Sequence, residues 1–564
     1  MILFFTRARS RALQTFAPLL AAASAAGCAG SGASSPGLPQ SHGSAVRTAQ
    51  VRLTFTFPSR GASAAHRRTP AYVSPSIAAL TVTISQGASP GTTTTIAAPP
   101  AGSPPTVTTT VAAPVGVDTF AFSETDAKGV LLGRTTQQNT VVDGTLNTFG
   151  FTLDGNLASI RIAPASPVSP FVEGSLAAGF TLVGNLAIAF VATPLDADGN
   201  TIVSPGNLPQ ITVASASAGV VVYPNASDTF SLAAPAPVTT PVKITATGKD
   251  LDGNPISASA NVSALAAIYV ANFTTQSIGV YDENGTAIPV GTAAFAGLMN
   301  PAGIAYVPSK TPGITGTLAI TNTQNVSGGN PSPAPVAPVM TFDQSGMTLP
   351  LGAAAFANTA QPLFLSYANV GGTDEIAVPN YSSSTVGLYD PTGGALAAPG
   401  GFTGLAQPVQ AVYDPNADAK AGAFFVTNLG SFTLNKFRSD GTAVGKGVAA
   451  GNHTMGVAYD SNNNRLYVAY SGQVATVSTS MASPAGIAEF DETPAAVSTT
   501  GTFANSNTSA AYTGIVFDPF LKRLLVADAG TNSIVAFTEA GAAVTLPAGA
   551  FAKLSDPMSL AIVP

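Results

Sequence analysis

The sequence has few charged residues, and this shortage limits which partners it can have. Only 9% of the 564 residues are Asp, Glu, Lys or Arg, and the formal net charge is −6. The basic residues gather in two short segments, one with Arg7, Arg9 and Arg11 and one at His66-Arg67-Arg68. A nucleic-acid backbone is bound by many clustered Lys and Arg side chains, so we expect no nucleic-acid partner.

Histidine, cysteine and tryptophan are scarce or absent. Of three histidines only His453 lies in the C-terminal half, so a multi-histidine metal site cannot form there, and a Ser-His-Asp triad could use only this residue. Cys28 is the only cysteine, which excludes an internal disulfide and thiol chemistry in the folded part. The absence of Trp removes the commonest platform for stacking against sugars, although Tyr and Phe remain.

The residues that are abundant favour strands. Gly (56 residues) and Pro (44 residues) break helices, whereas the many Val and Thr residues suit a pleated sheet. The sequence lacks the heptads and long charged faces that are typical of exposed helices. We therefore predict an all-β chain.

The N-terminal residues resemble the signal peptide of a bacterial lipoprotein. A basic segment is followed by an apolar run from Leu13 to Ala26, which is too short to span a bilayer. Ala25-Ala26-Gly27-Cys28 is similar to a lipobox, although that motif prefers Leu where Ala25 stands. The resemblance implies a signal peptide over residues 1–27, lipid attachment to Cys28 and a flexible tether over residues 28–49. Ordinary signal cleavage near Ala26, with Cys28 incidental, is the alternative.

The residue after Cys28 bears on where the protein is held. By the lipoprotein sorting rules, Ala29 in place of Asp implies the outer membrane or the cell surface rather than the inner membrane. A periplasmic or secreted protein is the alternative. We expect a monomer that meets the membrane through its lipid anchor alone.

A first unit with alternating strands follows the tether. Apolar and polar residues alternate in segments such as Val51 to Phe57 and Ile160 to Ile162. Alternation buries one face of each strand, which predicts a β-sandwich over residues 50–164. A Pro-rich joint from Pro164 to Pro170 ends this unit.

A second unit, residues 165–264, resembles a bacterial immunoglobulin-like domain, because strands rich in Val, Thr and Ala lead into Asp-x-Asp-Gly-Asn turns. These turns are Asp196 to Asn200 and Asp250 to Asn254. Their clustered oxygens suit calcium, but they lack the longer loop and distal Glu of an EF-hand, and Asp-Gly is also a favoured hairpin turn. We prefer the bare turn. The apolar stretch Leu176 to Leu195 is interpreted as two strands joined by a turn at Gly184-Asn185, not as a membrane span.

From Leu265 to the C-terminus one pattern recurs at intervals of about fifty residues. In its most regular element, an aromatic residue is followed four positions later by Gly, or in one case by Pro. This element occurs at Tyr281–Gly285, Phe342–Gly346, Tyr389–Gly393, Phe437–Gly441, Phe490–Pro494 and Phe537–Gly541. The interval accommodates four short antiparallel strands, which is one blade of a β-propeller.

Two further strand patterns precede the aromatic element. One is apolar and ends in Asn, Asp or Tyr, at Ile268–Asn272, Leu318–Asn322, Ile376–Asn380, Phe424–Asn428, Leu466–Tyr470 and Leu524–Asp528. An earlier strand occurs at Gly303–Tyr306, Ala411–Asp414, Gly456–Asp460 and Gly514–Asp518. The region opens with the later type and ends with the earlier type, Ser559–Val563. We therefore expect the last strand to pair with the first and close a ring without exposed edges.

These strands are similar to those of NHL and YVTN repeats, with their G-I-A-x-D, L-Y-V-A-N/D and I-x-V-F/Y-D patterns. The resemblance covers residues 265–564 and implies a six-bladed β-propeller that follows two β-sandwich domains. It implies no particular function, because propellers carry many.

The residues that end the apolar strands are candidate ligand-binding residues. If they lie at one rim of a central channel, they form a ring of oxygen atoms that could bind a polar ligand, together with His453 in the loop before an earlier-type strand. This ring comprises Asn272, Asn322, Asn380, Asn428 and Asp528. A single acidic residue suits a metal ion poorly. The alternative is that these side chains cap local turns, and that His453 bonds nearby backbone.

Two functions fit these features. The preferred one is an envelope-anchored lipoprotein whose propeller binds or scaffolds an envelope protein or a glycan through loops of one face. We assign no catalytic residue and no cofactor, with calcium left open. The alternative is a propeller hydrolase or lactonase with a metal at the channel mouth. That activity requires carboxylates from different blades to converge there, whereas the binding function predicts a channel without such a cluster.

Overall fold

The computed structural model describes residues 46–57, 73–89, 91–100, 103–203, 206–225, 228–310, 315–323, 337–472, 484–497, 503, 507 and 509–564. These residues are almost entirely strand and turn, which confirms the prediction of an all-β chain. The one helix among them, α1 (Ala417–Lys420), is a single turn in which Asp418 and Ala419 have positive φ angles. Within the same residues, no helix has the length and apolar character to cross a bilayer.

The first unit (residues 46–157) has two sheets that share one core. In spatial order, the sheets are β4 (Thr106–Pro114), β1 (Thr48–Thr56), β7 (Asn147–Thr148) and β3 (Thr92–Ala97), β2 (Ala79–Ser85), β5 (Gly116–Thr125), β6 (Leu131–Val141), β8 (Asp154–Gly155). Alternate residues of β1, such as Val51 and Leu53, pack with Leu80 of β2 and Phe120 of β5. The period-two pattern thus places one face of each strand in the core.

The second unit (residues 158–265) also has two sheets. In spatial order, they are β10 (Val172–Ser175), β11 (Gly179–Val183), β17 (Pro255–Leu265), β16 (Val238–Lys249), β13 (Thr212–Ser215) and β14 (Val221–Pro224), β15 (Thr229–Ala233), β12 (Ile188–Leu195), β9 (Ser159–Pro164). Strand β9, which contains Ile160 and Ile162, pairs with β12, although the sequence placed it in the first unit. Alternation indicates that one face is buried, but it does not identify the partner strand.

The turn that was predicted at Gly184-Asn185 is confirmed. Gly184 has a φ of +70° and follows β11, and β12 begins four residues later. The two strands belong to different sheets, so the turn carries the chain across the core.

The repeat region (residues 266–564) forms six antiparallel sheets from its described residues. The strands of each sheet are given in spatial order, and the strand named first or second is called the first or second strand of its sheet. Three of the sheets are β39 (Pro557–Val563), β18 (Ala267–Asn272), β19 (Ser277–Asp282); β20 (Pro301–Val307), β21 (Thr317–Asn322), β22 (Val339–Phe342), β23 (Thr348–Leu349); and β24 (Ser366–Val370), β25 (Thr373–Asn380), β26 (Thr385–Tyr389), β27 (Ala395–Leu396). The other three are β28 (Pro408–Asp414), β29 (Ala423–Asn428), β30 (Thr433–Arg438), β31 (Ala443–Ala449); β32 (Thr454–Asp460), β33 (Arg465–Tyr470), β34 (Gly486–Phe490); and β35 (Tyr512–Asp518), β36 (Arg523–Asp528), β37 (Ser533–Thr538), β38 (Ala543–Val544).

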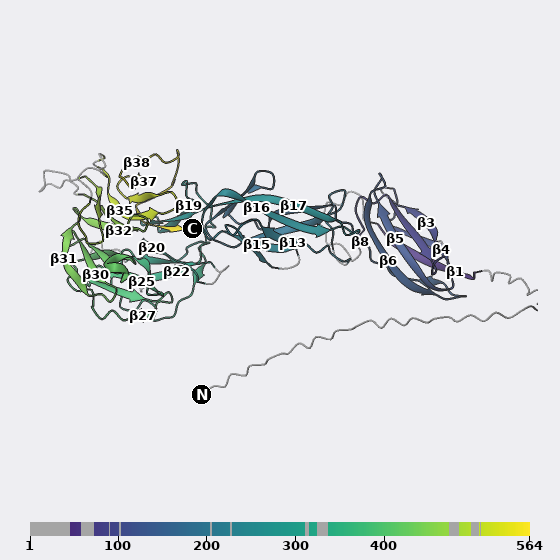
Figure 1. Ribbon diagram of the computed structural model, residues 1–564, viewed down its shortest axis with the longest axis horizontal. Coiled ribbons are helices and arrows are strands. Elements are labelled where there is room, and N and C mark those ends of the chain that lie inside the picture. Colours follow the sequence, from purple (N-terminus) through teal and green to yellow (C-terminus); the bar gives the residue numbers. More distant parts are fainter. Residues whose placement is uncertain are drawn as a thin grey trace, which may run out of the picture.

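The first strands of these sheets contact one another in cyclic order. The contacts run from β39 to β20, β24, β28, β32, β35 and back to β39. The sheets of the repeat region lie together at the left of Figure 1, with the strands of the first two units to their right. Strand β39 pairs antiparallel with β18, so that Val563 lies opposite Ala267 and Leu560 opposite Val270. This pairing confirms the expectation that the last strand completes the sheet that opens the region.

Glycines in the first strands allow this close contact. A Cβ atom on Gly456 would lie 2.8 Å from the carbonyl oxygen of Thr513, and one on Gly514 would lie 2.5 Å from that of Met558. Likewise, a Cβ on Gly303 would lie 2.6 Å from the Cα of Phe364. Each glycine therefore lets a first strand approach the backbone of the next sheet.

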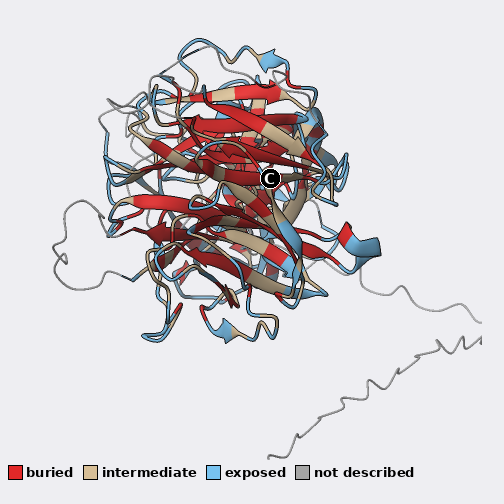
Figure 2. Cartoon of the chain, turned by 90° about the vertical axis from the view of Figure 1, so that its left-hand side faces the viewer, coloured by how far each residue is buried: buried red, intermediate tan, exposed pale blue. Residues whose placement is uncertain are grey.

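The second strands are buried on both faces. Every residue of β18, β29 and β36 is buried, and Figure 2 shows buried strands filling the interior of the repeat region. Neighbouring sheets cover the two faces of such a strand, which explains why the sequence reads as a continuous apolar run rather than an alternating one.

An aromatic residue in the loop between sheets packs against the aromatic residue of the repeat element. The ring centroids of Phe356 and Tyr389 lie 5.0 Å apart, and those of Phe402 and Phe437 lie 5.1 Å apart. The same pairing joins Phe295 to Phe342 and Phe551 to Tyr281, at 5.3 and 5.1 Å. At these four places the regular spacing of the repeat thus reflects a packing unit that joins the connecting loop to the next sheet.

Polar contacts join the three parts of the chain. The Ser74 hydroxyl of the first unit donates to Oδ2 of Asp196 in the second unit at 2.6 Å. Between the second unit and the repeat region, Nδ2 of Asn185 donates to the hydroxyl of Tyr306 at 2.6 Å. Gly184 lies beside Ala267 and Val563, so the second unit contacts the repeat region where its first and last strands meet.

Candidate functional site

A cavity of about 250 Å³ lies on the axis of the six sheets. All six first strands contribute to its wall, with Ile304, Val412, Val457, Val516 and Ile562 among the apolar lining residues. On the side where these strands begin, Ala302, Phe364 and Val409 form a buried cluster with Met455 and Met558 packed against it. The cavity therefore lies toward the ends of the first strands, with an apolar cluster behind it.

The polar groups of the cavity wall are uncharged. Tyr306, Tyr367 and Tyr459 come from β20, β24 and β32. The other polar residues of the wall are Ser366 of β24 and Gln410 of β28. The 17 described residues of the wall include no Asp, Glu, His, Lys or Arg. An uncharged wall suits an uncharged ligand, because a charged one would lose its hydration without gaining a partner.

The three tyrosines stay protonated at neutral pH. Burial raises the pKa of Tyr306, and burial together with the hydrogen bond to Asp374 raises the pKa of Tyr367 to about 12. Burial likewise raises the pKa of Tyr459. None of these hydroxyls therefore supplies a phenolate nucleophile, and each acts as a hydrogen-bonding group.

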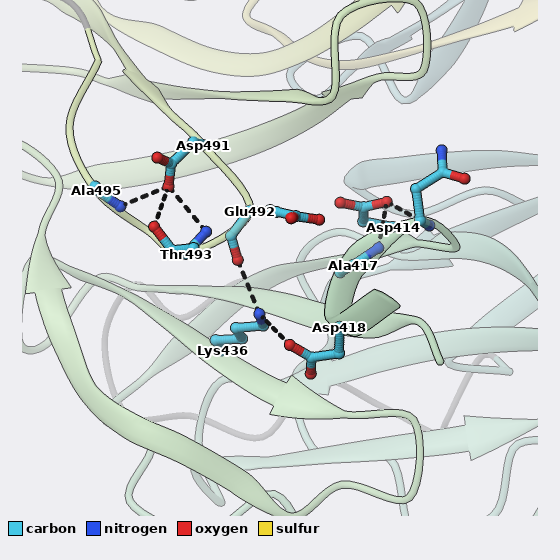
Figure 3. A network of polar contacts seen from close by, with 9 residues as sticks. Asp414, Ala417, Asp418, Lys436, Asp491, Glu492, Thr493 and Ala495 are labelled. Carbon is cyan, nitrogen blue, oxygen red and sulfur yellow. Dashed lines mark hydrogen bonds and ion pairs between the residues drawn. The ribbon is translucent and has the colours of Figure 1, made fainter. Parts of the chain in front are cut away.

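Several charged side chains of the repeat region form ion pairs between or beside the sheets. Nζ of Lys436 lies 2.7 Å from Oδ1 of Asp418 and donates to the Glu492 carbonyl at 2.9 Å, which links two sheets (Figure 3). Nε of Arg523 lies 3.2 Å from Oδ2 of Asp518. In the described part of the chain, no group of three or more His, Cys, Asp or Glu side chains is placed to bind a metal ion.

The predicted rim residues are buried, and their oxygens hold the loops that lead into the first strands. Oδ1 of Asn272 accepts the backbone N–H of Ser555 at 3.0 Å, and Oδ1 of Asp528 accepts that of Ala511 at 2.8 Å. The same bond joins Asn322 to Met299, Asn380 to Ala360 and Asn428 to Ala406, at 3.0, 2.9 and 3.0 Å. These contacts match the capping alternative, while ligand binding by the five residues stays a prediction.

His453 belongs to a second series of loop residues at the same end. It precedes β32 with a φ of +54°, as Asn300, Gln407 and Asp556 precede β20, β28 and β39 with positive φ angles. Nδ1 of His453 lies 2.7 Å from the Gly472 carbonyl, and its ring packs edge-on against Phe432. The structure thus gives His453 a backbone partner and places no carboxylate on its ring, among the described residues.

The Asp-x-Asp-Gly-Asn segments are hairpin turns in which the first carboxylate is already occupied. Oδ1 of Asp196 accepts the N–H groups of Asp198 and Asn200 at 3.1 and 2.8 Å. Oδ1 of Asp250 accepts those of Asp252 and Asn254 at 2.9 and 2.8 Å. This bonding is that of the bare turn, and a calcium ion stays a prediction.

One of the predicted site residues, Cys28, lies outside the described residues. The residues that the sequence analysis missed are the cavity tyrosines, although two of them were visible in it. Tyr306 and Tyr459 stand near the ends of the earlier strand type, which the cyclic contacts place around one axis.

Comparisons with known proteins find low similarities. No protein-family profile and no curated protein matches the chain. A 6-phosphogluconolactonase candidate from Bacteroides uniformis is 16% identical, covering 53% of this chain and 99% of its own, with a TM-score of 0.33. An auxiliary nutrient binding protein from Bacteroides ovatus is 12% identical, covering 69% and 86%, with a TM-score of 0.32. Such scores carry no argument, so the fold rests on the strand pairing above.

Proposed function

We propose that the protein is an envelope-anchored lipoprotein whose repeat region is a six-bladed β-propeller of the NHL or YVTN type that acts as a binding module. The support for the propeller is the cyclic contact of six first strands and the pairing of β39 with β18. The two preceding units would be β-sandwich spacers, the second of them immunoglobulin-like. Lipid on Cys28 would hold the chain at the outer membrane or cell surface.

The observation that carries the binding function is the wall of the axial cavity. Six strands converge on one cavity whose described lining carries three tyrosines, a glutamine and a serine among apolar residues, without a carboxylate or an imidazole. A few convergent polar groups on an apolar wall are typical of ligand-binding cavities. Hydrolysis would require an acid, a base or a metal at this point, and the described wall offers uncharged groups instead.

The test uses the full chain with Cys28→Ser, which removes the lipidation site and keeps both preceding units. We expect saturable stabilisation of its thermal unfolding by members of a library of small uncharged compounds, because a ligand that binds only the native state raises its stability. Val516→Phe, which fills the cavity from β35, should abolish that stabilisation. Val544→Phe on the outer strand β38 is the matched control, since both valines are partly exposed.

Two results would overturn this function. One is turnover of a panel of lactones or esters by the purified chain, which would favour the hydrolase. The other is equal ligand response in the Val516→Phe and Val544→Phe variants. The anchor is tested separately, because Cys28→Ser should abolish fatty-acid labelling of the expressed protein.

A further inference from the structure

Among the described residues, the oxygen of the Tyr306 hydroxyl accepts a hydrogen bond and its proton has no acceptor. Nδ2 of Asn185 donates to this oxygen at 2.6 Å, and the backbone N–H of Gly316 also faces it. A phenol accepts and also donates, so two N–H groups on the oxygen leave the O–H to find an acceptor. No described residue accepts it. Asn185 and Gly316 both lie outside the cavity wall, whereas Tyr306 is part of that wall.

The amide of Asn185 is oriented by a further contact. Nε2 of Gln344, in the hairpin after β22, donates to Oδ1 of Asn185. In this arrangement the nitrogen of the Asn185 amide points to Tyr306. Gln344 is fully buried and its own backbone carbonyl accepts the hydroxyl of Tyr269 at 2.8 Å. The second unit therefore presents a donor to Tyr306 through a chain of part-buried hydrogen bonds.

The hydroxyls of the other two tyrosines of the wall donate hydrogen bonds to side chains of the protein. The Tyr367 hydroxyl donates to Oδ1 of Asp374, and that of Tyr459 donates to Oδ1 of Asn464, both at 2.8 Å. Gln410 resembles Tyr306 instead: its Oε1 accepts the N–H of Val457 at 2.9 Å, and among the described residues its Nε2 has no acceptor. In the described part of the chain, the wall thus has two donors without an acceptor, the Tyr306 hydroxyl and the Gln410 amide.

We propose that the cavity selects small uncharged molecules that present a carbonyl or ether oxygen, which Tyr306 and Gln410 bind by donation, and that Asn185 is a positioning residue that aims the Tyr306 hydroxyl. This inference rests on the proposed binding function and names its ligand class. An acceptor oxygen satisfies donors that would otherwise stay unpaired beside an apolar wall. A hydrocarbon leaves them unpaired, and an ammonium or carboxylate ion is desolvated without a counter-charge.

The experiment measures binding of four six-membered-ring probes to the full Cys28→Ser chain by saturation-transfer NMR titration. The probes are cyclohexanone, methylcyclohexane, cyclohexylammonium and cyclohexanecarboxylate. We expect cyclohexanone to bind about tenfold more tightly than methylcyclohexane, and the two ions to bind more weakly still. Tyr306→Phe should weaken cyclohexanone binding about three- to tenfold and leave methylcyclohexane unchanged. Tyr367→Phe is the control, because its proton is already donated to Asp374.

The positioning role is read from selectivity, which a loss of structure alone would not change. Asn185→Ala should reduce the ratio of cyclohexanone to methylcyclohexane affinity, although Asn185 lies outside the wall. Gln410→Met provides a second variant with the same expectation, in case Tyr306→Phe does not fold. An unchanged ratio in these variants, or tightest binding of an ion by the Cys28→Ser chain, would overturn this inference while cavity binding stands. If no probe binds, the proposed binding function fails with it.

Discussion

The first unit and the repeat region bury their strands in different ways. In β1 buried and exposed residues alternate, whereas in β36 all six residues are buried. A strand of the first unit has the core on one face and solvent on the other, while a second strand of the repeat region has a neighbouring sheet on each face. A short continuous run of apolar residues therefore indicates a strand that lies between two sheets. A run in which apolar and polar residues alternate indicates a strand with one face exposed to solvent.

The largest difference in stability between the two regions is expected when the C-terminal strand is removed. Deleting residues 559–564 removes most of β39 and the buried Leu560, Ala561 and Val563, and leaves β18 unpaired on one edge. We expect a loss of about 5 kcal/mol or more for the repeat region, seen by calorimetry, with the unfolding transition of the first unit unchanged. Deleting Pro564 alone, which follows β39, is the control. Equal melting temperatures for the full and shortened chains would refute ring closure as a source of stability.

Adjacent core substitutions sharpen the comparison within single strands. Leu524→Ala and Leu525→Ala should each destabilise the repeat region by about 2–5 kcal/mol, because both side chains are fully buried on opposite faces of β36. Of the adjacent pair in β1, Leu53→Ala should destabilise the first unit by a similar amount. Thr54→Ala, at an exposed position, should change the free energy of unfolding by no more than about 0.5 kcal/mol. Denaturant unfolding of the four variants measures the difference, and a tolerated Leu525→Ala would contradict burial on both faces.

Glycine substitutions test the close approach of the first strands. Gly456→Ala should destabilise the repeat region by about 1–3 kcal/mol, since its new Cβ would lie 2.8 Å from the carbonyl oxygen of Thr513. Gly150→Ala in the first unit is the matched control, because no atom lies within 4 Å of that Cβ. The midpoint of chemical unfolding of each variant is the measurement. Equal effects at both positions would mean that the first strands are packed less closely than described.

A change of pH should affect the stability of the first unit through Glu124. Glu124 is fully buried, its Oε1 has no hydrogen-bond partner among the described residues, and burial raises its pKa to about 8. Between pH 4.5 and 8 the folded chain keeps a proton that the unfolded chain has released, so stability falls as pH rises through this window. We expect the melting temperature of the first unit to fall by a few degrees from pH 5 to 8.5. Glu124→Gln should remove this fall, and persistence of the fall in the variant would assign it elsewhere.

Local patterns predicted much of the repeat region because its strands repeat. The apolar strands that end in Asn or Asp, the strands of the earlier type, and the pairing of β39 with β18 all follow from one repeated arrangement. A single copy of the pattern would not identify a sheet, but six copies at similar spacing together indicate six similar sheets. The domain boundaries, the immunoglobulin-like character of the second unit and the lipid anchor stay predictions.

Contacts between distant segments could not be predicted in this way. The sequence showed Gly184-Asn185 as a turn, but nothing in its pattern indicated that Asn185 would reach Tyr306. The strand-end residues were placed at the correct end of each strand, but the direction of their oxygens depends on loops with positive φ angles before the first strands. Such loop conformations depend on packing against the neighbouring sheet, and this packing could not be inferred from the pattern of a single sequence.

The pairing of β39 with β18 also sets the order of events during synthesis. The final seven residues of β39 must leave the ribosome, and cross any membrane on the way, before the opening sheet of the region has its first strand. Until then β18 presents an unpaired edge of the kind that invites aggregation or proteolysis. A chain that is cut within β39 therefore leaves this edge of β18 exposed.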